Sequence, residues 1–104
     1  MAMSLKPGTR LLSAVCATEM IAVRVPAGEL EITIGGVAPA LAAGDRDVAA
    51  GAQAGHDGGA LMGKRYVDDA DTIELLCTKP GPGVPAVGGA LLHVKEAKAL
   101  PSSD

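Results

Sequence analysis

The chain has 104 residues, of which 48% are hydrophobic and 20% are charged, and its formal net charge is −3. This length predicts a single domain, and no apolar run approaches the roughly 18 residues that a membrane-spanning helix needs. The chain holds one Tyr and neither Phe nor Trp, so its core must consist of aliphatic side chains that bury less area each. We therefore expect marginal stability for a lone chain, which favours self-association.

Charge and aromatic content argue against a nucleic-acid partner. Phosphate neutralisation supplies most of the affinity for nucleic acid, and the nine Lys and Arg residues are scattered, with Lys64–Arg65 the only adjacent pair. Single-strand binding also needs aromatic stacking platforms, and Tyr66 is the only aromatic residue. We expect neither a nucleic-acid nor a membrane partner.

The two cysteines, Cys16 and Cys77, are too few for a disulfide scaffold. The segment from Lys6 to Cys16 begins like a secretion signal, but its apolar stretch is too short and Glu19 follows at once. We therefore expect a cytoplasmic protein whose thiols stay free.

Three strands are expected in the first half of the chain. Residues 10–15 form a weak strand, and residues 19–25 form a clearer one, with Ile21, Val23 and Val25 on one face and Met20, Ala22 and Arg24 on the other. Residues 30–34 alternate Leu and Ile with Glu and Thr. The loop 26–28 contains Pro and Gly and is long enough for a hairpin.

The second half repeats this pattern. Residues 63–67 and 90–95 form weak strands, and residues 72–79 form a stronger one that places Ile73, Leu75 and Cys77 on one face. The loop 68–71 predicts a hairpin, whereas Pro-Gly-Pro-Gly at 80–83 cannot lie inside a strand. Residues 48–54 could form one or two helical turns at most.

A shift of 55 residues aligns Gly8-Thr9-Arg10-Leu11 with Gly63-Lys64-Arg65-Tyr66, and Glu19-Met20-Ile21 with Glu74-Leu75-Leu76. A two-residue gap then aligns the Gly-Gly pairs 35–36 and 88–89, which we interpret as positive-φ turns. The repeat-like halves are 5–41 and 60–100, and the Ala/Gly-rich tract 42–59 between them indicates a flexible connector. Chance similarity between Gly-rich segments is the alternative to duplication.

These six short strands predict one all-β domain over residues 1–104, built as a small barrel or sandwich with two pseudo-twofold three-stranded halves. The sheet edges of such a fold favour pairing with another copy.

No metal, cofactor or catalytic residue is assigned. The metal-ligand candidates Cys16, His56, Cys77 and His93 lie far apart, with no two within ten residues. We expect Cys77 to be an inert core thiol, His93 to lie at the surface, and the acidic loop 68–71 to form a turn. Cys77 with His93, or the acidic loop, in a cleft between the halves would instead suit a small enzyme or a small-ligand carrier.

The segments Gly63-Lys64-Arg65-Tyr66-Val67, Glu74-Leu75-Leu76-Cys77-Thr78-Lys79 and the ending at 98–104 resemble a group of small uncharacterised bacterial proteins, as do residues 5–10 and 13–16. The resemblance covers both ends of the chain but not the connector. It implies a cytoplasmic bacterial protein, and it carries over no activity, catalytic residue or substrate.

We therefore expect a small non-enzymatic binding or assembly module. It would be a homo-oligomer or an accessory subunit of a larger enzyme, the latter docked through the tail 100–104. Because basic residues recur at repeat-related positions and Tyr66 is the only large amphipathic side chain, the expected recognition residues are Arg10, Arg24, Arg65, Tyr66 and Lys79.

Overall fold

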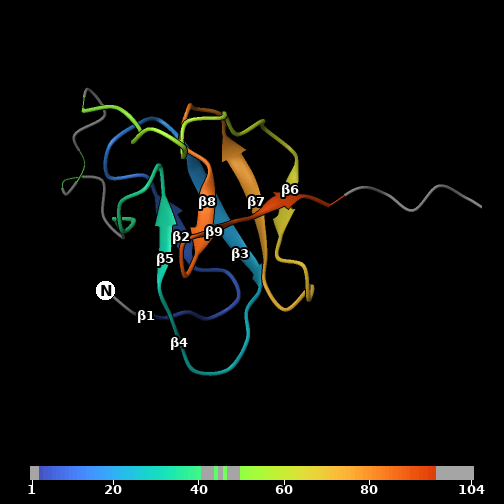
Figure 1. Ribbon diagram of the computed structural model, residues 1–104. Coiled ribbons are helices and arrows are strands. Elements are labelled where there is room, and N and C mark those ends of the chain that lie inside the picture. The colour runs from blue at the N-terminus through green and yellow to red at the C-terminus, as the bar shows by residue number, and fades with distance from the viewer. Residues whose placement is uncertain (1–2, 41–43, 45, 47–49, 96–104) are drawn as a thin grey trace, which may run out of the picture.

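The computed structural model describes residues 3–40, 44, 46 and 50–95 (Figure 1). The described residues contain β-strands, turns and loops but no α-helix, which confirms the all-β prediction. Within these residues no helix has the length and hydropathy to span a membrane. The tail 100–104, through which the accessory-subunit alternative would dock, lies outside the described residues, as does most of 41–49.

Ten short strands form three antiparallel sheets. In chain order they are β1 (Met3–Ser4), β2 (Arg10–Leu12), β3 (Glu19–Arg24), β4 (Glu29–Leu30), β5 (Ile32–Ile34), β6 (Arg65–Val67), β7 (Glu74–Lys79), β8 (Pro85–Val87), β9 (Ala90–Leu91) and β10 (His93–Val94). The five-stranded sheet has the order β10-β6-β7-β3-β2, the three-stranded sheet has the order β5-β8-β9, and β1 pairs with β4. The sheets do not close into a barrel, so the sandwich is the compatible alternative.

The core lies between the five-stranded sheet and β5, which stands in front of it in Figure 1. Alternation grouped Ile21, Val23 and Val25 as the apolar face of β3, but pairing with β7 buries the opposite face. Met20 lies opposite Cys77 and Ala22 opposite Leu75, and all four are at most 2% exposed. The prediction that Cys77 is a core thiol is confirmed, and burial raises its pKa.

The strands of the two halves are interleaved. Strands β2 and β6, and likewise β3 and β7, begin 55 residues apart, while β5 and β8 begin 53 apart. Ile21 pairs with its counterpart Leu76, and Thr33 pairs with its counterpart Ala86. Of these matched strands, each half places two in the five-stranded sheet and one in the three-stranded sheet. The halves therefore do not form two separate three-stranded sheets, and their origin by duplication stays a prediction.

Some of the turns lie where the glycines in the sequence predicted them. Gly88 and Gly89, both with positive φ, form the two-residue turn between β8 and β9, and Gly35 and Gly36 also have positive φ, as expected. Loop 68–71 does join β6 and β7 as a hairpin. The hairpin expected at 26–28 is wrong, because β3 pairs with β2 and β7 while the chain crosses to β4 and then to the other sheet.

The described part of the expected connector is hydrogen-bonded to both halves. Gln53 donates its backbone N–H to Gly35 of the first half at 2.8 Å, and His56 accepts from Val84 of the second half at 2.9 Å. Flexibility of the segment 42–59 stays a prediction.

Candidate interaction surface

The side of the five-stranded sheet that faces away from the core, here called the outer face, carries most of the expected recognition residues. One row of cross-strand partners runs Arg10, Ile21, Leu76, Arg65, and Lys95 extends it by donating its backbone N–H to Arg65 at 2.7 Å. The row has a half-buried apolar centre and basic side chains at both ends. The acidic and basic side chains of the outer face and its central apolar pair are Arg10, Glu19, Ile21, Arg24, Arg65, Glu74, Leu76, Lys79 and Lys95.

Two β-bulges bring Arg24 and Lys79 to this face. In a regular strand Arg24 would share the inner face with Met20 and Ala22. Val23 is an extra residue in β3 with no partner in β7, and Thr78 is an extra residue in β7 with no partner in β3. As a result, Arg24 lies opposite Glu74 and Lys79 lies opposite Glu19. Since cross-strand partners share a face, each bulge rotates a basic side chain outward.

Glu74 is a nearly buried carboxylate held by two basic residues. Its side chain is 3% exposed, and it accepts hydrogen bonds from Arg65 at 2.6 Å and from Lys95 at 3.0 Å. The Arg65 hydrogen bond, followed by that of Lys95, lowers the pKa of Glu74 despite its burial. Glu74 therefore stays ionised at neutral pH, and it fixes Arg65 and Lys95 on the outer face.

Glu19 occupies the equivalent place in the first half. Its carboxylate accepts a hydrogen bond from Arg46 at 2.8 Å and lies 3.9 Å from the Lys79 ammonium group. The Arg46 guanidinium also donates to the backbone carbonyls of Ser13 and Cys16, at 2.8 and 2.7 Å. Sequence reasoning did not single out Arg46 or either glutamate, although the pair Glu19 and Glu74 stands in the repeat alignment.

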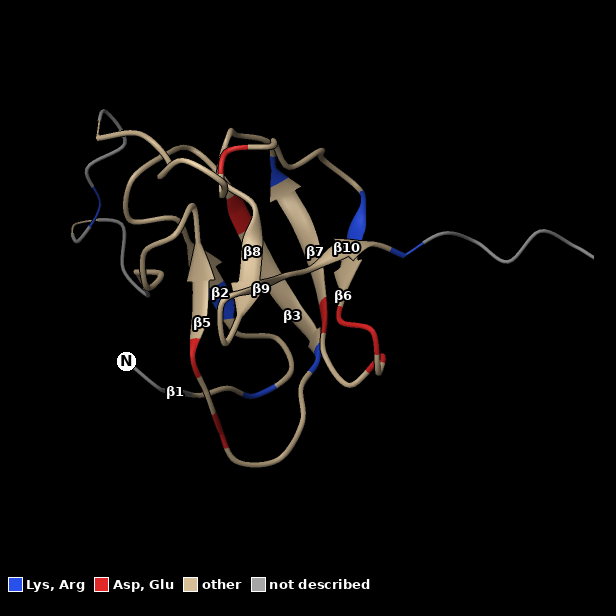
Figure 2. Ribbon diagram, in the orientation of Figure 1, with Lys and Arg blue, Asp and Glu red and all other residues tan. Residues whose placement is uncertain are grey.

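The outer face carries more basic than acidic side chains. Figure 2 shows an acidic and a basic residue at opposite ends of both β3 and β7, which are antiparallel, so each carboxylate lies beside a basic side chain. Five basic side chains and two carboxylates belong to this face, which gives it a formal charge of +3. Counting Arg46, which contacts Glu19, together with Asp71, which contacts Arg24, leaves this value unchanged. Because the chain as a whole carries −3, the remaining residues carry −6, of which −3 belongs to residues outside the described part of the chain. The outer face is thus a cationic surface on an acidic protein.

Tyr66 does not join the four expected basic residues on this face. Its ring lies in the core at 4% exposure, and its hydroxyl accepts the backbone N–H of Leu61 at 3.0 Å. Tyr66 pairs with Leu75, which also faces inward. The structure therefore gives Tyr66 a packing role, and its part in recognition is untested.

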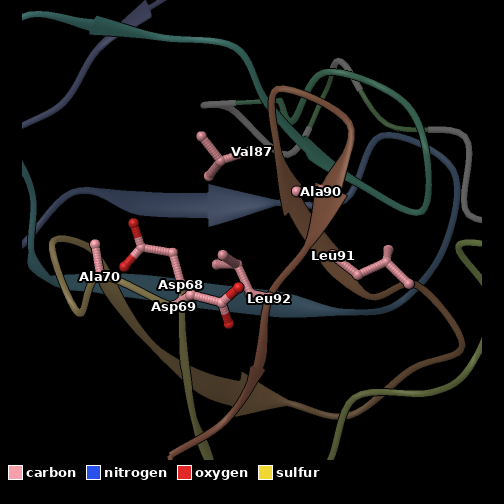
Figure 3. A pocket seen from close by; sticks show the side chains of 7 residues that line it. All are labelled: Asp68, Asp69, Ala70, Val87, Ala90, Leu91 and Leu92. Atoms are coloured by element: carbon pink, nitrogen blue, oxygen red, sulfur yellow. The ribbon is translucent and has the colours of Figure 1, made fainter.

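The acidic loop 68–71 lies at the end of β6 and β7, beside two open hollows of about 310 Å³ each. In the first hollow, shown in Figure 3, loop residues face the β8–β9 hairpin and Leu92. The second hollow includes His93, whose Nδ1 lies 3.6 Å from the Asp69 carboxylate. Both hollows are lined by residues of the second half, and neither lies between the halves. The lining residues are Val67, Asp68, Asp69, Ala70, Asp71, Val87, Ala90, Leu91, Leu92, His93, Val94 and Lys95.

Asp68 and Asp71 of this loop make contacts with different partners. Asp68 accepts hydrogen bonds from the Thr72 backbone N–H at 2.7 Å and from the Thr72 hydroxyl at 2.5 Å. Burial alone would raise the pKa of Asp68, but these hydrogen bonds outweigh it and lower the pKa. Asp71, which has a φ of 58°, lies 3.6 Å from the Arg24 guanidinium. Both residues therefore shape the turn, as the sequence predicted for the acidic cluster.

Sequence reasoning missed a buried polar cluster around Cys16. The Cys16 thiol lies 3.0 Å from the Ser13 hydroxyl and 3.4 Å from the Thr18 hydroxyl, and Thr18 donates to the Gly83 carbonyl at 3.1 Å. Burial raises the pKa of the Cys16 thiol, but these hydrogen bonds together reverse the shift and lower it. All three side chains are at most 2% exposed, so the cluster holds loop 13–18 against loop 80–83.

Cys77 and His93, the pair that the enzyme alternative would use, do not share a hollow. Cys77 lies in the core, and its thiol donates to the Lys79 carbonyl at 3.2 Å, while His93 is at the surface as expected. Cys77 lines neither of the hollows beside the acidic loop. In the part of the chain that the structure describes, no three His, Cys, Asp or Glu residues are placed to share a metal ion.

The fold and this surface define a class: a small two-layer antiparallel β-protein with a cationic sheet face. Comparison with models of known protein families, with curated proteins and with solved structures finds no match for the chain.

Proposed function

We propose that this protein is a non-enzymatic assembly module that associates with further copies of itself through the outer face of its five-stranded sheet. The excess of basic side chains on one face carries this proposal: a face of formal charge +3 belongs to a chain of net charge −3. Opposite potentials on two surfaces of one molecule attract copies to each other and orient their encounter. The proposed cytoplasmic location would leave this attraction subject to screening by physiological salt.

The composition of the face supports a protein partner. Ile21 and Leu76 form a half-buried apolar centre, Val23 beside them is 38% exposed, and basic side chains surround them. Protein interfaces combine an apolar centre with a polar rim in this way. Four of the expected recognition residues, namely Arg10, Arg24, Arg65 and Lys79, belong to the rim. The matched registers of β3 and β7 further support the proposed internal duplication, which would have produced this face from two like halves.

Sedimentation velocity over micromolar to submillimolar concentrations tests the proposal. The protein should associate in about 0.02 M salt, and association should weaken in about 0.5 M salt, where the screening length falls several-fold. A strict monomer over the whole concentration range in low salt would overturn the proposal. Association that is unaffected by salt would contradict the role of the charged face.

A further inference from the structure

We infer that the outer face of one copy docks onto the acidic end of a second copy, formed by the loop 68–71 and by Leu91, which lines the same hollow. This inference rests on the proposed self-association and names the surface that the outer face binds. Three arguments support it. The acidic end has an accessible carboxylate, both surfaces carry an exposed apolar side chain, and two outer faces that paired with each other would repel.

The accessible carboxylate is Asp69. Its side chain is fully exposed, and the imidazole of His93 at 3.6 Å is its one ion-pair contact within 4 Å among the described residues. Asp68 and Asp71 are engaged by Thr72 and Arg24 of the same copy. Asp69 is therefore the carboxylate of this loop best placed to meet a basic side chain of another molecule.

Apolar surface accompanies the charge on both sides. Leu91 is 49% exposed and lines the same hollow as Asp69, and Val23 is the exposed apolar side chain on the outer face. The outer-face row from Arg10 to Arg65 crosses four strands, or about 14 Å at the usual strand spacing. That width is enough to seat a hairpin loop of four residues.

Face-to-face pairing of two outer faces would instead bring together two surfaces of formal charge +3. Like charges placed across an interface disfavour binding unless they are separated or neutralised. An acidic end against a basic face has no such penalty, so the second copy contributes its acidic end.

Charge reversal on each surface, followed by mixing, tests this inference. Arg10 has no carboxylate within 4 Å among the described residues, so R10E removes no described ion pair. D69K changes a fully exposed side chain. K6E is the matched control, because Lys6 is exposed and its described hydrogen bonds are made by its backbone. Circular dichroism would check that all three variants fold.

Each single reversal should weaken association by roughly tenfold or more in low salt, whereas K6E should have little effect. An equimolar mixture of R10E and D69K should regain association. The outer face of R10E then meets the acidic end of D69K with both charges reversed, and the outer face of D69K meets the acidic end of R10E with both charges native. Two results would overturn this inference and leave the proposed function standing. In the first, the native protein associates but the mixture of variants does not regain association. In the second, D69K associates as strongly as the native protein. A monomeric native protein would overturn the proposed function itself.

Discussion

Ile21 and Leu76 lie directly opposite each other on the two central strands of the five-stranded sheet, and 55 positions separate them in the chain. The same interval separates Val23 from Thr78, the residues at which the two bulges occur, and Glu19 from Glu74. The outer face therefore presents nearly the same groups when it is rotated by half a turn about the point between Ile21 and Leu76. This relationship makes Arg10 and Arg65 equivalent positions with different surroundings, which allows a controlled experiment.

The ion pairs of Glu74 should stabilise the fold in a pH-dependent way. The variant R65M removes the hydrogen bond of 2.6 Å to Glu74. We expect it to lower the free energy of unfolding by about 1 kcal/mol at pH 7, since Arg65 is half-exposed and solvent screens the pair. Urea unfolding followed by circular dichroism measures this difference. R10M is the matched control at the equivalent position, and it should change stability far less.

Acidification gives the same prediction a second readout. The pKa of Glu74 is lower in the folded protein than its ordinary value of 4.5. The stabilisation is therefore fully present above that ordinary value and is lost as the pH falls through the folded-state pKa. The difference between the native protein and R65M should shrink in this acidic range. A difference that stays constant down to pH 2 or so would show that Arg65 stabilises by packing rather than by charge.

Gly81 should be intolerant of any side chain. A Cβ atom at Gly81 would lie 2.5 Å from the backbone nitrogen of Thr18, whereas a Cβ atom at Gly58 would meet nothing nearer than a Val84 methyl group at 3.6 Å. Neither glycine has a positive φ, so the comparison isolates steric overlap. We expect G81A to cost about 1–3 kcal/mol of stability and G58A to cost less than about 0.5 kcal/mol. Thermal unfolding of both variants measures this, and equal midpoints would contradict the close approach of the two loops.

Removal of the Tyr66 hydroxyl separates packing from recognition. The variant Y66F leaves the part-buried N–H of Leu61 without its acceptor, and it should lower stability by about 1 kcal/mol. Because the ring is buried, self-association measured by sedimentation should stay unchanged after correction for folding. Loss of association in a fully folded Y66F protein would restore Tyr66 to the recognition surface.

Much of the fold could be predicted from the order of residues alone. Alternation located most of the longer strands, and paired glycines indicated the β8–β9 turn, where a positive φ at both positions excludes most other residues. The crossover at 26–28 could not be found in this way, because a Pro-Gly loop suits a hairpin and a change of sheet equally well. The short β8 was harder still, since it begins with Pro85, which lacks the donor that a strand interior needs.

The candidate surface could likewise be predicted only in part from the sequence. The sequence by itself determined which basic residues recur and that the protein is acidic overall, because both are properties of composition and spacing. Only the tertiary structure decided that Arg10, Arg24, Arg65 and Lys79 share one face while Tyr66 points into the core. The physical reason is cross-strand pairing: the faces of β3 and β7 depend on their partner residues and on one bulge in each, and a single extra residue turns every side chain beyond it to the other side.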